Sequence, residues 1–172
     1  MAGSLIKIDE EIVSSAVANV TLTGIDSTYD VYQVVSNNVA QTTISNNQLN
    51  IRLTSSGTPV TSSNYQRAAK ELKSNSSFSN KFYTNGTAMN TDGIGTATTD
   101  VINNSIYCFN FNNASEYSFI TYEGTRMQTS EVLGLQGGFS LNVQGANDGL
   151  QFYMTSGNID TGSTFTLYGL KK

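Results

Sequence analysis

The chain contains no histidine and no tryptophan, and it has only one cysteine and one proline. Without histidine, Ser-His-Asp and Cys-His catalysis are impossible, and so are histidine-ligated zinc and haem iron. A single cysteine, Cys108, cannot form an intramolecular disulfide or a cluster of thiolate ligands. We therefore expect no catalytic residue, no metal site and no cofactor, and we interpret Cys108 as a buried structural thiol.

Charged side chains are also scarce. They make up 13% of the 172 residues, with a net charge of −4 and a pI near 4.6, whereas about 25% is usual. Nucleic-acid binding requires clustered Lys and Arg, so we expect no nucleic-acid partner. No apolar run approaches the ~20 residues of a membrane span, and the first residues lack the pattern of a secretory signal. We therefore expect no membrane partner either.

Neutral polar residues take the place of the missing charges. The chain has 21 Ser, 21 Thr and 19 Asn, and these residues compete with the backbone for hydrogen bonds, which makes them poor in helix interiors. A helical bundle is therefore disfavoured. The hydrophobic share of 38% is enough for a core, and the length fits one domain.

Alternation of apolar and polar residues recurs along the chain. Leu49, Ile51 and Leu53, for example, alternate with Asn50 and Arg52, which is typical of a half-buried strand. Turns every 8 to 15 residues favour antiparallel pairing. We predict an all-β protein, a jelly-roll-like antiparallel β-sandwich of about eight to ten strands with at most one short helix. Residues 12–172 form a single domain behind an N-terminal arm, residues 1–11.

Two segments are less regular. Residues 63–73 fit a helix with Ala68, Ala69 and Leu72 facing inward, and they fit a strand with Tyr65 and Arg67 on one side equally well. Residues 74–100 are rich in Ser, Asn, Thr and Gly. We predict that this second segment is mostly loop, with one short strand around Phe78, Phe82 and Tyr83.

Candidate chemical sites are few. Asn90, Asp92, Gly93 and Asp100 resemble part of a calcium loop, but the third ligand and the terminal Glu are missing, so we interpret them as a glycine-rich turn. Glu116 and Glu123 are seven residues apart, which places them on opposite faces of a regular strand. That spacing does not suit a pair of catalytic acids, and we interpret both as solvating charges.

The tyrosines are candidates for surface recognition. Tyrosine is favoured in interfaces and in sugar platforms, because its ring buries area while its hydroxyl stays hydrogen-bonded. The alternative is that they are half-buried core residues. Candidates for surface positions are Tyr32, Tyr65, Tyr122, Tyr153 and Tyr168.

Three segments together resemble a known group of proteins. They are LTGIDSTYDVYQVVSNNV (residues 22–39), LNIRLTSSGTPVTSSNYQRA (49–68) and the closing FTLYGLKK (165–172). The chain thereby resembles small structural proteins of tailed, often marine, bacteriophages, which are associated with capsids and tails. The resemblance implies a jelly-roll-like sandwich without enzymatic activity, a turn formed by Gly24 and Asp26, and strands anchored by Tyr29 and Tyr32.

The function that we expect from this resemblance is that of a capsid decoration, or cement, protein. It would be located in the virion, assembled in the bacterial cytoplasm, and bind the major capsid protein or other virion proteins as a homo-oligomer such as a trimer. For partner binding we single out Leu5, Ile6, Ile8 and Ile12, which would add a strand to a neighbour. The alternatives are a tail, fibre or baseplate component and a carbohydrate-binding module.

Overall fold

The computed structural model describes residues 4–43, 47–95, 97, 99–128 and 130–171. The regular secondary structure of these residues consists of β-strands, without a helix. The described strands are β1 (Ser4–Ile12), β2 (Asn19–Thr23), β3 (Val31–Val39), β4 (Asn47–Ser55), β5 (Thr58–Pro59), β6 (Tyr65–Lys73), β7 (Phe78–Gly86), β8 (Met89–Ile94), β9 (Ile102–Phe109), β10 (Phe119–Gln128), β11 (Glu131–Leu141), β12 (Gly149–Met154) and β13 (Thr164–Lys171).

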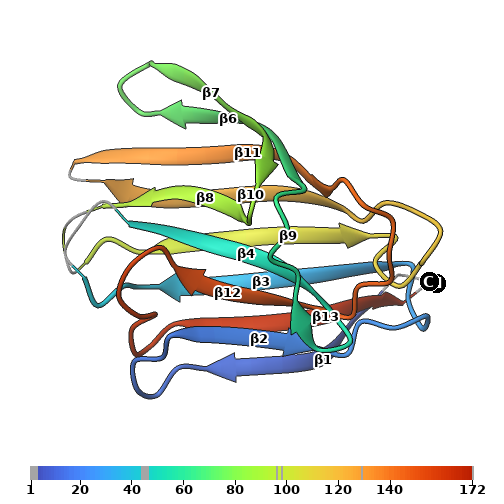
Figure 1. Cartoon of the computed structure of the whole chain (residues 1–172). Helices are drawn as coiled ribbons and strands as arrows, with labels where there is room; N and C mark the ends of the chain where they lie inside the picture. Colours follow the sequence, from blue (N-terminus) through green and yellow to red (C-terminus); the bar gives the residue numbers. More distant parts are fainter. Residues whose placement is uncertain (1–3, 44–46, 96, 98, 129, 172) are drawn as a thin grey trace.

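These strands form two sheets that pack face to face as an antiparallel β-sandwich (Figure 1). The large sheet has eight strands in the order β1-β13-β3-β9-β10-β11-β6-β7. The small sheet has the order β2-β12-β4-β5, and β8 also pairs with β4. Every paired couple of strands is antiparallel. The predicted all-β antiparallel sandwich is therefore confirmed.

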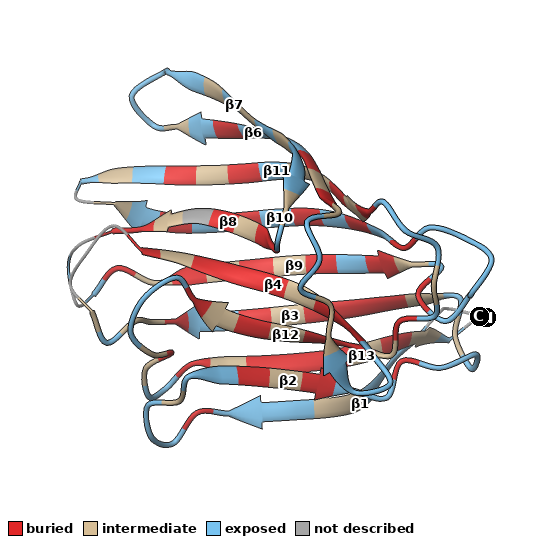
Figure 2. Ribbon diagram, viewed as in Figure 1, coloured by how far each residue is buried: buried red, intermediate tan, exposed pale blue. Residues whose placement is uncertain are grey.

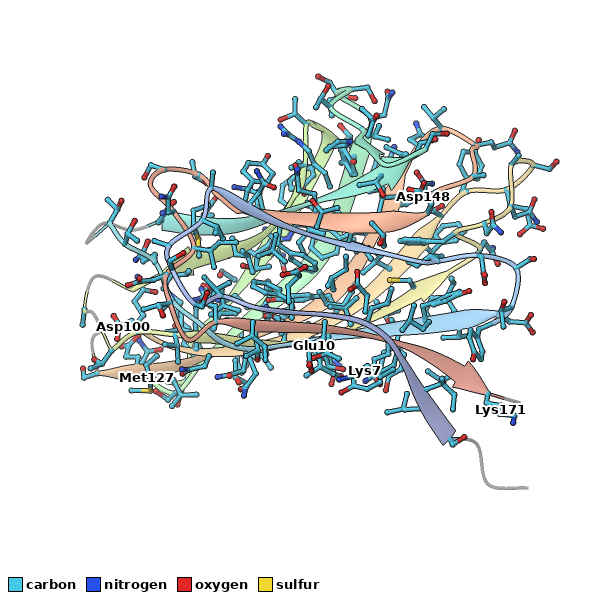
Figure 3. All side chains as sticks on the ribbon, turned by 90° about the horizontal axis from the view of Figure 1, so that it is seen from below. Lys7, Glu10, Asp100, Met127, Asp148 and Lys171 are labelled. Carbon is cyan, nitrogen blue, oxygen red and sulfur yellow. The ribbon has the colours of Figure 1, made fainter. Side chains whose placement is uncertain are left out.

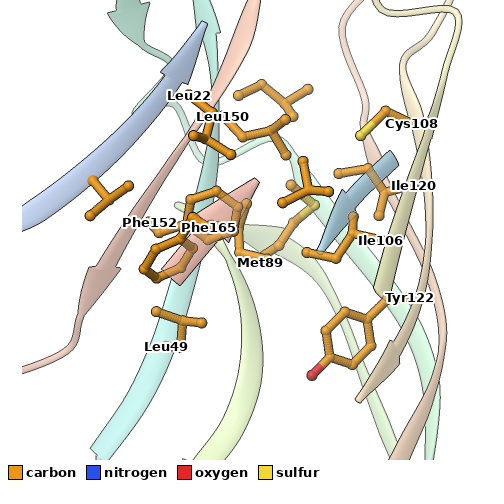
Figure 4. Packing of buried hydrophobic residues seen from close by; sticks show 14 of the residues in the cluster. Leu22, Leu49, Met89, Ile106, Cys108, Ile120, Tyr122, Leu150, Phe152 and Phe165 are labelled. Carbon is orange, nitrogen blue, oxygen red and sulfur yellow. The ribbon is translucent and has the colours of Figure 1, made fainter. Parts of the chain in front are cut away.

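The core lies between the facing sides of the two sheets, where buried residues alternate with more exposed ones along the strands (Figure 2). Leu49, Ile51 and Leu53 of β4 point inward and are at most 1% exposed. In Figure 4, Phe152 of β12 lies beside Phe165 of β13, and their ring centroids are 4.8 Å apart. This contact joins the two sheets and continues the period-two pattern that predicted the strands.

The two irregular segments both pair into sheets. Residues 65–73 form strand β6, with Tyr65 and Arg67 buried on one side, so the strand alternative is right for this segment. The prediction that residues 74–100 are mostly loop is wrong, because β7 and β8 occupy much of this range. The low hydrophobicity of β7 has a physical reason: it is an edge strand whose side chains are largely in solvent, so nothing requires a buried apolar face.

The segment that we set apart as an N-terminal arm is, from Ser4 onwards, the edge strand β1. It pairs with β13 over its length, with a bulge between Lys7 and Asp9. The strand ladder therefore holds this segment against its own domain.

The turn before β3 has the expected residues. Gly24 has a φ of +97°, a conformation that favours glycine. The Tyr32 hydroxyl donates to the Asp26 carbonyl oxygen at 2.7 Å and accepts from the Asp26 N–H at 3.0 Å. The ring of Tyr29 packs edge-on against that of Tyr32, with 5.7 Å between centroids. Together these contacts hold the turn against the strand that follows it.

Neighbouring glycines in β11 provide a test of the packing between β11 and β6. A Cβ at Gly137 would lie 2.5 Å from the Ala68 carbonyl oxygen, whereas a Cβ at Gly138 would meet only the Ile120 carbonyl oxygen, at 3.7 Å. We expect Gly137→Ala to lower the free energy of unfolding by about 1–3 kcal/mol, because the two strands must separate. Gly138→Ala is the matched control and should change it by less than about 1 kcal/mol. Urea unfolding measures both, and equal losses would contradict the packing described.

Candidate functional site

One edge of the large sheet is strand β1, which has no further strand on its far side within the described residues. Leu5 and Ile12 are 50% and 63% exposed, and Ile6 is also exposed. Ile8 is half-buried and packs against the core. Of the four partner-binding residues that we singled out, three are therefore open to solvent and the fourth lies against the domain's own interior.

The opposite edge is strand β7, and our sequence analysis did not select it as a binding surface. Its only ladder partner among the described strands is β6. Phe78 and Phe82 are 64% and 78% exposed, and they lie on the same face of the strand as Asn80. The signal that could have identified this edge is the alternation in FSNKF, where the phenylalanines are four residues apart and therefore share a face.

The two edges carry opposite charge. Strand β1 contains one lysine and three acidic residues, Asp9, Glu10 and Glu11. The β6–β7 hairpin contains four basic residues and one acid, Glu71. On β1, the Lys7 ammonium lies 3.1 Å from the Glu10 carboxylate. Figure 3 shows these two side chains on the same side of the molecule as Met127 of β10. One end of the large sheet is therefore acidic and the other is basic.

The outward face of the large sheet has a hollow near its middle. A depression of about 440 Å³ is lined by residues of β3, β6, β9, β10 and β11, among them Asn103, Ser105, Glu123 and Gln136. A neighbouring depression of about 280 Å³ shares Ser105, Glu123 and Gln136 with it and also includes Tyr107. The larger depression is open because Gly134 of β11 has no side chain. In the register of the sheet, Gly134 lies between its neighbours Thr125 of β10 and Leu72 of β6.

The Glu123 carboxylate in this hollow accepts a hydrogen bond from Gln136 at 2.7 Å. Among the described residues that line the two depressions, those with ionisable side chains are Glu123, Tyr107 and Tyr122, and none is basic. The surface therefore presents hydroxyl and amide groups and one carboxylate beside the apolar side chains of Val35, Leu72 and Leu135. That chemistry suits a neutral, hydroxyl-rich ligand better than an anion.

Three of the tyrosines that we selected as surface candidates are buried. Tyr32, Tyr65 and Tyr122 are at most 2% exposed, so this part of the interpretation is wrong. Each occupies an inward position of its strand and has a partner for its hydroxyl; Tyr122, for example, donates to the Asn104 side-chain oxygen at 2.7 Å. Burial raises the pKa of Tyr65 to about 12. Tyr153 and Tyr168 are half-buried.

A charged cluster lies on the inward side of the large sheet, at its β6–β7 end. The Arg126 guanidinium contacts the Glu71 carboxylate at 2.6 Å, and both side chains are 4% exposed. Lys73 and Lys81 lie 3.5 Å from the same carboxylate. Burial acts to raise the pKa of Glu71, but the hydrogen bonds from Arg126 and Ser79 and the charge of Lys81 outweigh it and lower the pKa. Glu71 is therefore held as a carboxylate by its neighbours.

The remaining candidates have structural roles in the described residues. Cys108 is fully buried on β9, and burial raises the pKa of its thiol. Asn90 accepts from Arg67 at 2.6 Å and Asp100 accepts from the Ala97 N–H at 3.0 Å, while the side chain of Asp92 lies outside the described part. Glu116 precedes β10 and Glu123 lies within it. No group of three or more Cys, Asp or Glu residues that could hold a metal ion occurs among the residues that the structure describes.

No protein-family model matches the chain, and no curated protein is significantly similar to it. Within the described residues there is also no helix of the length and hydrophobicity that crossing a membrane requires.

The buried ion pair provides a prediction about stability. Glu71→Gln leaves the Arg126 guanidinium buried without its counter-ion, so we expect a loss of about 3–5 kcal/mol in the free energy of unfolding near pH 7. The control Glu123→Gln removes an exposed carboxylate and should cost less than about 1 kcal/mol. Urea unfolding of both variants makes the comparison, and equal effects would show that the pair is not needed.

The same variant has a predicted pH dependence. Because the pKa of Glu71 is lowered from its ordinary value of 4.5, its ionic stabilisation is complete above pH 4.5 and is lost as the pH falls through the folded-state pKa. The difference in stability between the wild-type protein and Glu71→Gln should therefore narrow below that pH. A difference that stays constant on acidification would contradict this account.

Proposed function

We propose that this chain is a non-enzymatic structural protein of a bacteriophage virion, and specifically a capsid decoration protein that binds the lattice of the major capsid protein. The observation that carries the proposal is that the large sheet ends in two edge strands, each with exposed large apolar side chains. A solitary domain normally protects such edges with short strands, charges or covering loops. The resemblance of residues 22–39, 49–68 and 165–172 to phage structural proteins supports the same conclusion.

The low charge of the surface is consistent with this role. Interface cores are depleted in charged residues, and the chain has few of them. A protein that binds only the assembled lattice stabilises it by mass action, by RT ln(1 + [L]/Kd) for each site. The exposed apolar residues at the edges would anchor contacts between neighbouring subunits of the shell, including contacts between adjacent copies of the decoration protein, as aromatic anchors do in other interfaces.

Co-sedimentation tests the proposal directly. Purified protein is mixed with capsids that lack it, and we expect saturable binding at a copy number set by the lattice. The variant Phe78→Ser/Phe82→Ser should bind at least about tenfold more weakly, because two anchors of the β7 edge are lost. Val143→Ser is the matched control, since Val143 is 46% exposed but lies in the connection after β11 and not on an edge strand.

The other outcomes of this experiment are informative. Recovery of the protein with tails or host cells, and not with capsids, would replace decoration by a tail, fibre or baseplate role. Failure to bind any virion part would overturn the structural role as a whole.

A second candidate function, carbohydrate binding, is favoured by one observation, the hollow on the outward face. Its lining of Asn, Ser, Thr and Gln side chains offers hydrogen bonds to sugar hydroxyls, and Tyr107, 36% exposed, offers a ring for stacking. This site is separate from both sheet edges. A glycan could therefore be bound while the edges are occupied.

A glycan array followed by titration calorimetry tests this second candidate. Tyr107→Ala should weaken glycan binding by about tenfold, because a stacked ring contributes roughly 0.5–1.5 kcal/mol beyond its buried area. Tyr117→Ala is the control, since Tyr117 is 42% exposed in the connection before β10 and does not line the hollow. The candidate falls if no glycan binds, or if both variants lose binding equally.

A further inference from the structure

We infer that the large sheet continues from one copy of the chain into the next, with β1 of one copy adding to β7 of another as an antiparallel strand. The inference rests on the proposed structural role, and it names a second copy of this chain as the partner of the two edges. Neither edge has a further strand beside it within the described residues. Each strand is nine residues long, so the two edges are matched in length.

The direction of the strands allows this continuation. The large sheet has eight strands, and every neighbouring couple is antiparallel. Because eight is even, the first strand and the last strand run in opposite directions. A second copy in the same orientation therefore presents its β1 antiparallel to β7 of the first copy, and the alternation of the sheet is preserved.

The register of the sheet places apolar residues opposite one another at this junction. Successive register partners link Glu10 of β1 to Asn80 of β7 across all eight strands. If the next copy continues this row, its Glu10 lies opposite Asn80. Two positions further along on the same face, Ile12 then lies opposite Phe78. These two side chains are 63% and 64% exposed in the single chain, and the junction would bury them against each other.

The other face of the junction brings opposite charges together. A second row of register partners links Asp9 of β1 to Lys81 of β7 across the sheet. In the continued sheet, Asp9 of one copy therefore lies opposite Lys81 of the next. Opposite charges at directly opposed positions stabilise a strand pair, and like charges destabilise it.

Charge also decides between this arrangement and a two-fold dimer. Pairing β1 with β1 would bring two acidic strands together, and pairing β7 with β7 would bring two basic hairpins together. Only the head-to-tail arrangement joins the acidic edge to the basic one. Such an interface is heterologous, so it closes into a ring or extends as a filament according to the rotation between copies.

Both edge strands also carry features that, in other proteins, keep an edge strand from pairing with another chain. A bulge interrupts β1 between Lys7 and Asp9, and Lys81 lies on β7. Bulges and lysines protect lone edges from pairing. Large exposed apolar side chains on the same two strands have the opposite effect, and there are five of them: Leu5, Ile6, Ile12, Phe78 and Phe82. A bulge on one strand and a lysine on the other restrict pairing to a partner of matching shape and charge.

Disulfide trapping on the purified full chain tests the junction. Two single variants are prepared, Glu10→Cys and Asn80→Cys, which leave Ile12 and Phe78 in place. Cys108 is fully buried and so does not compete for oxidation. In the proposed register the two new cysteines face each other at Cα distances of about 4.5–5.5 Å, within the range for a disulfide. We expect rapid formation of a covalent dimer in the mixture of the two variants, and at least tenfold less in either variant alone.

The remaining measurements make the test decisive. A chain carrying both cysteines should give a ladder of covalent oligomers or one closed ring, and adding Phe78→Lys should reduce it at least tenfold, while adding Val143→Lys should not. Dimers formed as readily by Glu10→Cys alone, or by Asn80→Cys alone, would overturn the head-to-tail arrangement in favour of a two-fold pair. Absence of dimers from the mixture at high protein concentration would overturn the inference.

Failure of this inference is distinguishable from failure of the proposed function, because no capsid is present in the trapping experiment. A chain that co-sediments with capsids but gives no disulfide retains the decoration role and loses the self-association. A chain that forms the disulfide but binds no virion part retains the continued sheet and loses the decoration role.

Discussion

The constraint on which the rest of the structure depends is that two sheets of unequal width share one core. The large sheet has eight strands, and the small sheet does not reach across all of them (Figure 1). Where the two sheets face each other, the interior is apolar, with Leu22, Phe152 and Phe165 fully buried. At the β6–β7 end, the inward positions instead carry Glu71 and Arg126. An ion pair with additional hydrogen bonds can occupy such a position, whereas an unpaired charge there would be costly.

This division separates the parts of the chain that maintain the fold from the parts that can meet a partner. The buried tyrosines, Cys108 and the ion pair satisfy requirements of the interior. The side chains that do not stabilise the interior lie on the two edge strands and on the outward face of the large sheet. Their exposure to solvent does not weaken the packing of the core. A single exposed apolar side chain is ordinary, but several that gather on one edge strand contribute little to the stability of the single chain and mark a surface for a partner.

The alternation along the sequence was sufficient to predict the class of the fold, because most inward residues of a half-buried strand are apolar. Leu49, Ile51 and Leu53 show this directly. The same rule did not identify β7, since an edge strand in solvent has no buried face to mark it. It also misplaced Tyr32, Tyr65 and Tyr122, because a tyrosine suits an inward position once a partner for its hydroxyl is available, and Asp26, Val60 and Asn104 provide that partner. The partner of Tyr122, Asn104, is 18 residues away in the sequence. Only the register between β9 and β10 shows that the two side chains lie close together.

The charge distribution across the large sheet is difficult to explain from the single chain alone. Four of the nine basic residues lie in the β6–β7 hairpin, although the whole protein is acidic. Arg126 alone is enough to neutralise Glu71, yet Lys73 and Lys81 also lie within 3.5 Å of that carboxylate. Lys81 helps to keep Glu71 ionised, but the four basic residues of the hairpin still outnumber its one acid. This excess positive charge lies beside an edge that bears two exposed phenylalanines. An acidic strand with exposed apolar residues, of the same length and opposite direction, is the surface that this edge would accept, and the chain carries such a strand at the other end of the same sheet.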